Sequence, residues 1–321
     1  MTKLGYQIPN FTYPGVDNAD IFANVIAQAK AAEDAGFDRV FVMDHFYQLP
    51  GIGAPEEPMY ECYSVLSALA QHTEKVRLSA LVTGNTYRHP TLLAKTITAL
   101  DHVSNGRATL GIGAGWFELE HDSLGYEFGT FTDRFEKLEE ALQIILPMLQ
   151  GEKVSLDGKH YQVADAVNSP PPISRVPIML GGSGEKKTLR MVAQYADESN
   201  LSSGGIDEIP RKLDALAAHC ERLGRDRSEI KVTKLTMVMV APTMEEAEAD
   251  LAEMAGVKGW NDEVMEMVKM ILFYGDPDTV GEKLQATMDT GIDGMTINLP
   301  GNGHNIDRIG LLGDIAQRVM S

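Results

Sequence analysis

The 321-residue sequence contains only two cysteines, Cys62 and Cys220, and neither belongs to a C-x-x-C pair. This scarcity excludes a disulfide framework and predicts a reducing, cytoplasmic location. Positive charge is also in short supply, because 28 Lys and Arg residues stand against 46 Asp and Glu residues, which gives a net charge of −18. Such a field repels nucleic acids and anionic membrane surfaces, so we expect neither as a partner.

Long hydrophobic runs are missing as well. No stretch approaches the roughly 18 apolar residues of a transmembrane helix, and residues 1–6 do not begin the apolar segment of a signal peptide. The remaining composition, 44% hydrophobic and 23% charged, is that of an ordinary globular protein. The length suits either two domains or one closed α/β barrel.

Short apolar runs alternate with helical patterns along the chain. Eight runs predict strands, and a helical pattern follows each of them. Because the runs are apolar throughout, they favour a parallel sheet that is covered on both faces. Eight such units predict a (β/α)8 TIM barrel in a single domain over residues 1–321, with a doubly wound sheet as the alternative. The predicted strands are residues 4–9, 38–43, 76–82, 107–112, 176–180, 197–201, 230–240 and 294–299.

Two segments interrupt this alternation and are predicted to be insertions. Residues 151–175 contain Asp157-Gly158 between alternating residues, which predicts a hairpin, and then three consecutive prolines that form a stiff connector. Residues 257–275 form the second insertion, and apolar residues recur there at helical spacing from Val264 to Ile271.

The loops that follow barrel strands carry function, so we expect the functional residues there. Gly181-Gly182-Ser183-Gly184-Glu185 follows an apolar strand and begins a predicted helix over residues 185–195. Glycines let backbone N–H groups approach an anion, and a helix N-terminus adds partial positive charge. The spacing differs from that of a Walker loop. The loop is therefore either a phosphate site or a plain tight turn.

Two further loops hold candidate residues. His45, which ends the second strand with Asp44, suits proton transfer or a hydrogen bond to a reactive ring, although a capping histidine would have the same pattern. The small and polar residues from Val82 to Asn85 would allow a flat ligand to lie against the backbone.

The loop after the fourth strand, residues 111–116, has the sequence GIGAGW. It superficially resembles a dinucleotide fingerprint, but Trp116 stands where the third glycine is required, so we reject a Rossmann site. Either the backbone approaches a ligand closely here, with Trp116 as a pocket wall, or the glycines only pack tightly at the barrel rim.

Two groups of acidic residues are expected to have no catalytic or metal-binding role. Glu118, Glu120, His121 and Asp122 contain no H-E-x-x-H pattern, so we expect a solvated loop and no metal. Glu139-Glu140 is expected on the exposed face of a helix. No G-x-S-x-G motif is present, and Ser183 lacks the surroundings of a hydrolase nucleophile.

Four motifs in this order resemble the bacterial luciferase-like superfamily, and more narrowly the coenzyme F420-dependent oxidoreductases of actinobacteria. The resemblance extends from about residue 4 to residue 320. It implies a TIM barrel that binds a deazaflavin or a flavin at the carboxyl ends of its strands. The motifs are residues 42–46 (VMDHF), 83–90 (TGNTYRHP), 111–116 (GIGAGW) and 181–185 (GGSGE).

The resemblance also implies roles for individual residues. Asp44 and His45 match family residues beside the ring, and residues 81–83 match a region with a non-proline cis peptide against the back of the ring. Residues 181–185 match the loop that holds the cofactor phosphate. The predicted catalytic residue is His45, and Asn10, Phe11 and Trp116 are predicted to form the wall of the substrate pocket. The predicted cofactor-binding residues are Asp44, Val82, Thr83, Gly84, Asn85, Gly115, Gly181, Gly182, Ser183, Gly184 and Glu185.

The sequence departs from the family's glucose-6-phosphate dehydrogenases at two positions. Leu49 stands where those enzymes have a tryptophan, four residues after the histidine, and Trp116 falls near their glutamate. We therefore do not predict sugar-phosphate oxidation. Without that acid, His45 is the one candidate left for moving a proton.

Three functions remain open at this point. The first is hydride transfer between coenzyme F420 and a small organic substrate, with reduction favoured slightly over oxidation. The second is an FMN-dependent monooxygenase that uses O2. The third is a cofactor-binding barrel without catalysis. The family resemblance further implies a homodimer and, as a possible partner, a separate F420 or flavin reductase.

Overall fold

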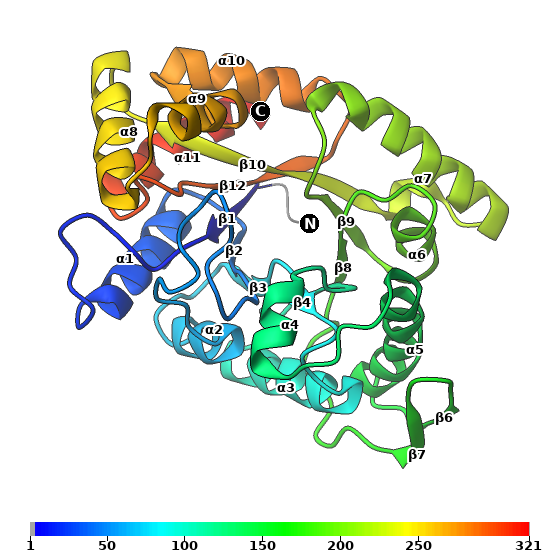
Figure 1. Cartoon of the computed structure of the whole chain (residues 1–321). Coiled ribbons are helices and arrows are strands. Elements are labelled where there is room, and N and C mark those ends of the chain that lie inside the picture. The colour runs from blue at the N-terminus through cyan, green and yellow to red at the C-terminus, as the bar shows by residue number, and fades with distance from the viewer. Residues whose placement is uncertain (1–3, 321) are drawn as a thin grey trace.

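The computed structural model describes residues 4–320 as a nearly closed barrel of parallel strands with helices around the outside (Figure 1). Nine strands follow one another around the barrel. Their order is β3 (Arg77–Ala80), β2 (Arg39–Val42), β1 (Leu4–Ile8), β12 (Gly294–Asn298), β10 (Lys231–Val240), β9 (Glu198–Leu201), β8 (Ile178–Gly181), β5 (Leu110–Gly113) and β4 (Thr83–Gly84).

Strand β3 lies within the predicted third strand, residues 76–82, and β4 directly follows that range. The cis peptide bond Leu81–Val82 separates them, at the place the family resemblance implied. β3 pairs with β2, β4 pairs with β5, and a bridge between Leu78 and Ala108 brings the two edges of the sheet together. The predicted eight-unit TIM barrel is therefore confirmed.

Helices cover the outer surface of this sheet, and the main hydrophobic core lies between the two layers. Outward-facing strand residues such as Val40, Leu78 and Leu110 are fully buried there. The covering helices are α1 (Ile21–Asp34), α2 (Cys62–Leu69), α3 (Pro90–Val103), α5 (Phe131–Leu149), α6 (Thr188–Tyr195), α7 (Ile209–Leu223), α10 (Pro277–Met288) and α11 (Ile306–Met320).

Both predicted insertions contain regular structure. The first forms an antiparallel hairpin of β6 (Val154–Asp157) and β7 (Gln162–Ala166), as Asp157-Gly158 predicted. In the second region α8 (Met244–Lys258) is followed by α9 (Asp262–Ile271) and by β11 (Phe273–Gly275), which pairs with β10. A second small core joins α8 and α9 to the barrel through Met239, Leu251, Met254, Val268 and Leu272.

Side chains fill the interior of the barrel. Phe41, Leu81 and Met179 form a buried cluster against the partly buried Val82 and Leu235. Val82 occupies the space that side chains at Gly113 and Gly181 would need, because an added Cβ would lie 2.9 and 2.7 Å from its methyl carbons. These two glycines are therefore required by the close approach of Val82.

A polar chain crosses the interior next to this cluster. The Asn298 amide donates to Gln7 Oε1 at 2.7 Å, and the Gln7 amide donates to the Leu81 carbonyl at 3.3 Å. The last strand, the first strand and the interrupted third strand are thus joined by side-chain hydrogen bonds inside the barrel.

Several local expectations are wrong. The acidic run is not a solvated loop but the short helix α4 (Glu118–Leu124), which buries Glu120 and His121. Glu139 and Glu140 are also more than an exposed face, because Glu139 pairs with Arg190 at 2.7 Å and Glu140 accepts backbone hydrogen bonds from residues 159–161. Finally, α6 begins at Thr188, three residues later than predicted.

Both cysteines are free and buried, as expected for a chain without disulfides. Among residues 4–320, no helix has the length and apolar character needed to span a membrane. The two ends of the described chain lie at the amino-end face of the barrel. β1 begins there at Leu4, and the last turn of α11 reaches the same face, where Gln317 donates to the Ala35 carbonyl at 2.7 Å.

Candidate active site

His45 follows the carboxyl end of β2 at the mouth of the barrel. Its imidazole is flanked by the rings of Trp116 and Phe117, each in an edge-on arrangement with centroids 5.8 Å away. The side chain is 13% exposed. Its Nδ1 atom lies 3.0 Å from the Glu120 carboxylate, whereas no hydrogen bond of Nε2 occurs within residues 4–320. His45 is therefore fixed on one side and open on the other.

Glu120 is a residue of this site that the sequence does not single out, because it was expected in a solvated loop. Its side chain is 0% exposed and is surrounded by donors. Oε1 accepts the backbone N–H groups of Phe46 and Tyr47, the latter at 2.9 Å, while Oε2 accepts the Tyr87 hydroxyl and contacts His45. Helix α4 thus places one carboxylate behind the loop that carries the histidine.

These donors keep Glu120 ionised. Burial by itself raises the pKa of a carboxyl group, but the hydrogen bonds from His45, Tyr87 and Tyr47 outweigh it and lower the pKa of Glu120 below the ordinary value. The partner hydroxyl responds in the opposite sense, because burial and the hydrogen bond to Glu120 raise the pKa of Tyr87. The site therefore contains a buried anion that touches an imidazole.

Asp44 lies beside His45 in the chain and has a different environment. Arg88 donates to both of its oxygens, at 2.6 and 2.9 Å, and the Gly84 N–H donates at 3.0 Å. Burial raises the pKa of Asp44, and Arg88 opposes that rise. Arg88 also pairs with Glu61 at 2.6 Å. The carboxylate of Asp44 therefore anchors the loop after β4 and is not presented as a free group.

The loop after β4 is held against the neighbouring strands. The Thr83 hydroxyl bonds to Tyr63 at 2.5 Å, and the Asn85 N–H donates to the Gly113 carbonyl at 3.0 Å. Val82 is partly exposed at this end of the barrel, next to Gly181. Gly115 has a φ of +81°, and Arg134 donates to its carbonyl at 3.1 Å. The predicted cofactor residues of strands β4 and β5 thus lie together at the mouth.

The glycine-rich loop joins the same end of the barrel. Gly182 has a φ of +124°, which favours glycine, and its N–H donates to the Asn200 carbonyl at 3.0 Å. The hydroxyl of Ser183 accepts the Ser203 N–H at 3.1 Å and donates to the Ser203 carbonyl at 3.2 Å. This exchange fixes the glycine-rich loop to the loop after β9, and Gly184 remains exposed.

Cationic side chains surround this loop. Arg211 pairs with Glu185 at 3.1 Å, so the one acidic residue of the loop is compensated. The Lys187 ammonium lies 5.0 Å above the Phe131 ring and donates to Thr132 at 3.3 Å. Together with the N-terminus of α6, this charge makes the loop suitable for a phosphate group despite the acidic net charge of the chain.

The predicted substrate-pocket residues are placed differently from one another. Trp116 is 60% exposed and stacks on Phe117 at the rim. Phe11 is only 1% exposed and packs edge-on against Tyr60, so it belongs to the core and does not wall a pocket. Asn10 donates to the Pro300 carbonyl at 2.8 Å.

Several buried amide oxygens near the barrel mouth have no hydrogen-bond partner within residues 4–320. Two of them belong to Asn10, which follows β1 by two residues, and to Asn298, the last residue of the neighbouring β12. A buried acceptor without a donor is costly, and a polar ligand with donor groups would satisfy it. This observation, together with the phosphate-compatible loop, fits an extended polar cofactor across the barrel mouth.

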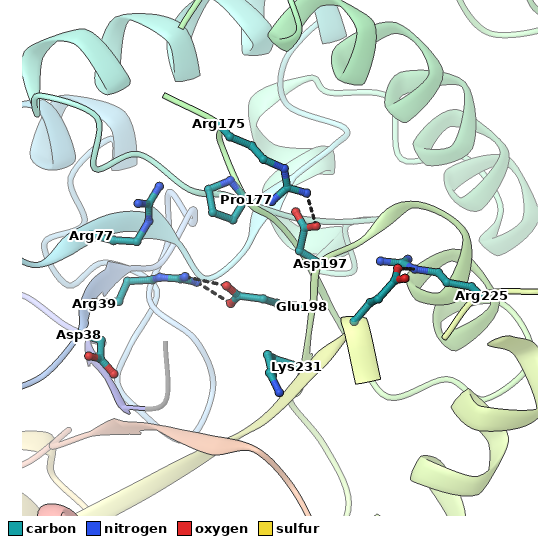
Figure 2. A pocket seen from close by; sticks show the side chains of 10 residues that line it. Asp38, Arg39, Arg77, Arg175, Pro177, Asp197, Glu198, Arg225 and Lys231 are labelled. Atoms are coloured by element: carbon teal, nitrogen blue, oxygen red, sulfur yellow. Dashed lines mark hydrogen bonds and ion pairs between the residues drawn. The ribbon is translucent and has the colours of Figure 1, made fainter. Parts of the chain in front are cut away.

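A pocket of about 690 Å³ lies at the opposite end of the barrel and is not part of this site (Figure 2). Its lining residues lie at or near the amino ends of the barrel strands. Ion pairs connect some of them, such as Arg39 with Glu198 at 2.8 Å and Arg175 with Asp197 at 2.5 Å. In this fold the amino-end face serves stability and the carboxyl-end face serves catalysis. We therefore assign the site to the end that carries His45.

One surface cluster has the composition of a metal site. Asp133, Glu136 and His160 offer ligand atoms within 4.8 Å of one another. The Lys159 ammonium lies 2.7 Å from Glu136 and 3.5 Å from Asp133, so a protein cation already compensates these carboxylates. We do not assign a metal to this cluster.

Comparison with known proteins connects this geometry to a family. Residues 2–294 match the family described as luciferase-like monooxygenase. An F420-dependent glucose-6-phosphate dehydrogenase of Microbacterium testaceum is 30% identical over 294 residues, which cover 84% of this chain and 85% of the relative. A 5,10-methylenetetrahydromethanopterin reductase of Methanolobus tindarius is 28% identical over 67% of this chain and 60% of its own length.

Solved structures share the fold at low identity. The F420-dependent tetrahydromethanopterin reductase of Methanopyrus kandleri aligns with a TM-score of 0.77 and 20% identity over 100% of this chain and 99% of its own. A monooxygenase of Streptomyces bottropensis aligns with a TM-score of 0.83 and 16% identity over 99% and 100%. The fold is therefore common to F420-dependent enzymes and monooxygenases.

Proposed function

We propose that this chain, which belongs to the luciferase-like monooxygenase family, is an oxidoreductase that uses coenzyme F420. One observation carries the proposal. The glycine-rich loop of residues 181–185, which suits a phosphate group, lies at the same end of the barrel as His45, whose imidazole is open on one side. Two relatives named as F420-dependent glucose-6-phosphate dehydrogenases match this chain at 30% and 28% identity, and they support deazaflavin over flavin.

The residues proposed to hold the cofactor lie on three neighbouring loops. The backbone of residues 181–184 with Ser183 would take the phosphate, and Lys187 would add positive charge. Val82 to Asn85 and Gly115 would lie along the ring. When bound, coenzyme F420 supplies a carbon centre that gives or accepts a hydride.

The chain's own contribution is orientation, exclusion of water and movement of a proton. We propose His45 as the catalytic residue, because its Nε2 is the unengaged nitrogen at the mouth. The exposed ring of Trp116 and the partly exposed Val82 give the site an apolar wall. This wall supports a small, neutral organic substrate, and reduction is the direction we propose.

An FMN-dependent monooxygenase is the second candidate, because the matching family is described as luciferase-like monooxygenase and the Streptomyces bottropensis enzyme shares the fold. That similarity, at 16% identity, concerns the fold alone. The same phosphate loop would serve either cofactor, so binding has to separate them.

The test is a fluorescence titration of purified protein with F420 and, side by side, with FMN. We expect saturable F420 binding and weaker FMN binding. Ser183→Asp adds a negative charge to the loop and should weaken F420 binding at least tenfold, whereas Ser228→Asp adds the same charge on the exposed amino-end face and should not. Absence of F420 binding refutes the proposal, and FMN binding with O2 consumption supports the monooxygenase.

The remaining features of the family stay predictions for this chain. We propose a homodimer in the cytoplasm, served by a separate reductase that supplies the reduced cofactor. Sedimentation of the purified protein tests the first of these, and a stable monomer would contradict it.

A further inference from the structure

The contact between His45 and Glu120 determines where the histidine carries its proton. Backbone N–H groups can only donate, so Oε1 of Glu120, which accepts from Phe46 and Tyr47, has no room for a proton of its own. The Tyr87 hydroxyl donates to Oε2. A carboxylate that receives these three donors is an acceptor toward its fourth partner as well.

The fourth partner is His45 Nδ1, which lies 3.0 Å from Oε2. Two acceptors cannot share a hydrogen bond, so the hydrogen between them belongs to Nδ1. A neutral imidazole with its hydrogen on Nδ1 has a lone pair on Nε2, and a protonated one has a donor there. Both states leave Nδ1–H bound to Glu120.

The rings beside His45 fix the direction of Nε2. Trp116 and Phe117 meet the imidazole edge-on at 5.8 Å each, so rotation of the imidazole would require these rings to move. Within the described residues, Nε2 has no protein partner and the side chain reaches solvent. The nitrogen that is free to exchange a proton is thus the one that faces the mouth.

We propose that Glu120 is a positioning residue that holds His45 as its Nδ1–H tautomer, so that Nε2 gives or takes the proton that accompanies hydride transfer. The inference rests on the proposed function. In the reducing direction the substrate gains a hydride at carbon and a proton at oxygen or at the neighbouring carbon. The proton leaves Nε2, the imidazole becomes neutral, and solvent returns the proton afterwards.

Charge supports the same assignment. The groups that face His45 are the anion of Glu120 from α4 and Asp44 from the end of β2, and Arg88 neutralises Asp44 through two hydrogen bonds. The Tyr87 hydroxyl and the backbone N–H of Tyr47 donate to Glu120 and add no charge to it. The Glu120 carboxylate is thus the acceptor that faces Nδ1 of His45 at 3.0 Å, and the imidazole is the hydrogen-bond donor to it. Glu120 itself keeps its charge throughout.

The experiment is nitrogen NMR of the cofactor-free protein labelled with ¹⁵N-histidine, with the His45 signals assigned by comparison with His45→Gln. We expect the neutral imidazole to carry its hydrogen on Nδ1 in the wild-type protein. In Glu120→Gln the amide can donate to Nδ1, so the signals should shift toward the Nε2–H tautomer. Asp122→Asn removes one charge on the exposed side of the same helix and should leave the tautomer unchanged.

The wild-type spectrum decides the matter even if Glu120→Gln fails to fold. A hydrogen on Nε2 with a bare Nδ1 in the wild-type protein overturns the proposal, and so does a folded Glu120→Gln protein that retains Nδ1–H. Because no cofactor is present, these outcomes are independent of the F420 titration. Failure to bind F420 would refute the proposed function and leave the tautomer result standing.

Discussion

A substitution at Gly181 tests whether Val82 is the reason for that glycine. In Gly181→Ala the new Cβ would lie 2.7 and 2.8 Å from the two methyl carbons of Val82 and 3.3 Å from its Cβ. A β-branched side chain cannot turn both methyl groups away. Overpacking of this kind costs about 2 kcal/mol, and we expect Gly181→Ala to lower the free energy of unfolding by that amount.

The second half of this test removes the obstacle. Val82→Ala deletes two partly exposed methyl groups, which should cost about 1 kcal/mol. In the double variant the two small side chains no longer collide, so its cost should be near 1 kcal/mol and not the sum of about 3. Urea unfolding followed by circular dichroism at one protein concentration measures all three values.

The matched control is a glycine with free space around it. A Cβ at Gly256 in α8 would meet nothing within 4 Å, so Gly256→Ala should raise stability by up to about 1 kcal/mol through helix propensity. Additive costs for Gly181→Ala and Val82→Ala would refute the reasoning. Such a result would mean that the backbone relaxes freely around this contact and that the loop does not depend on Val82.

Three other outcomes follow from the site. Arg88→Met leaves the Asp44 carboxylate buried without its cation, so it should lower the unfolding free energy by about 3–5 kcal/mol in urea titrations, and Asp44→Asn in the same chain should recover part of that loss. His45→Gln should slow the oxidation of reduced F420 by 2-cyclohexen-1-one, the probe acceptor, by about 10²-fold or more, while the affinity for F420 stays within about threefold. Turnover at the wild-type rate would mean that another group donates the proton. The pKa of Glu120 is lowered by folding from its ordinary value of 4.5, so its stabilising contribution is complete above that pH and is lost as the pH falls further. The stability difference between the wild-type protein and Glu120→Gln should therefore be constant near neutral pH and shrink in unfolding experiments below about pH 4.5.

The barrel was predictable because its signal is repeated. Eight apolar runs with helical patterns between them define the fold even when each boundary is uncertain, and the strand ends then select which loops to search. The spacing of Val264 and Ile271 also identified α9, and Asp157-Gly158 identified the hairpin. These signals depend on local periodicity and turn chemistry, which a sequence displays directly.

Glu120 could not be predicted in this way. An acidic residue in the run ELEHD is usually solvated, and its burial depends on donors from residues 46, 47 and 87, which are distant in sequence. A weak signal existed, since Gly125 ends α4 in the left-handed conformation that often follows a helix. The role of Asp44 was hidden for the same reason, because Arg88 lies 44 positions away.

The position of the chain ends has a practical consequence. Leu4 and the last turn of α11 lie on the face opposite His45. A fusion partner or an affinity tag at either end would therefore extend away from the mouth, and protein immobilised on a sensor surface through such a tag would present the mouth to the flowing solution. Both cofactors and candidate substrates can accordingly be screened on one immobilised preparation, with the barrel oriented the same way from either attachment point.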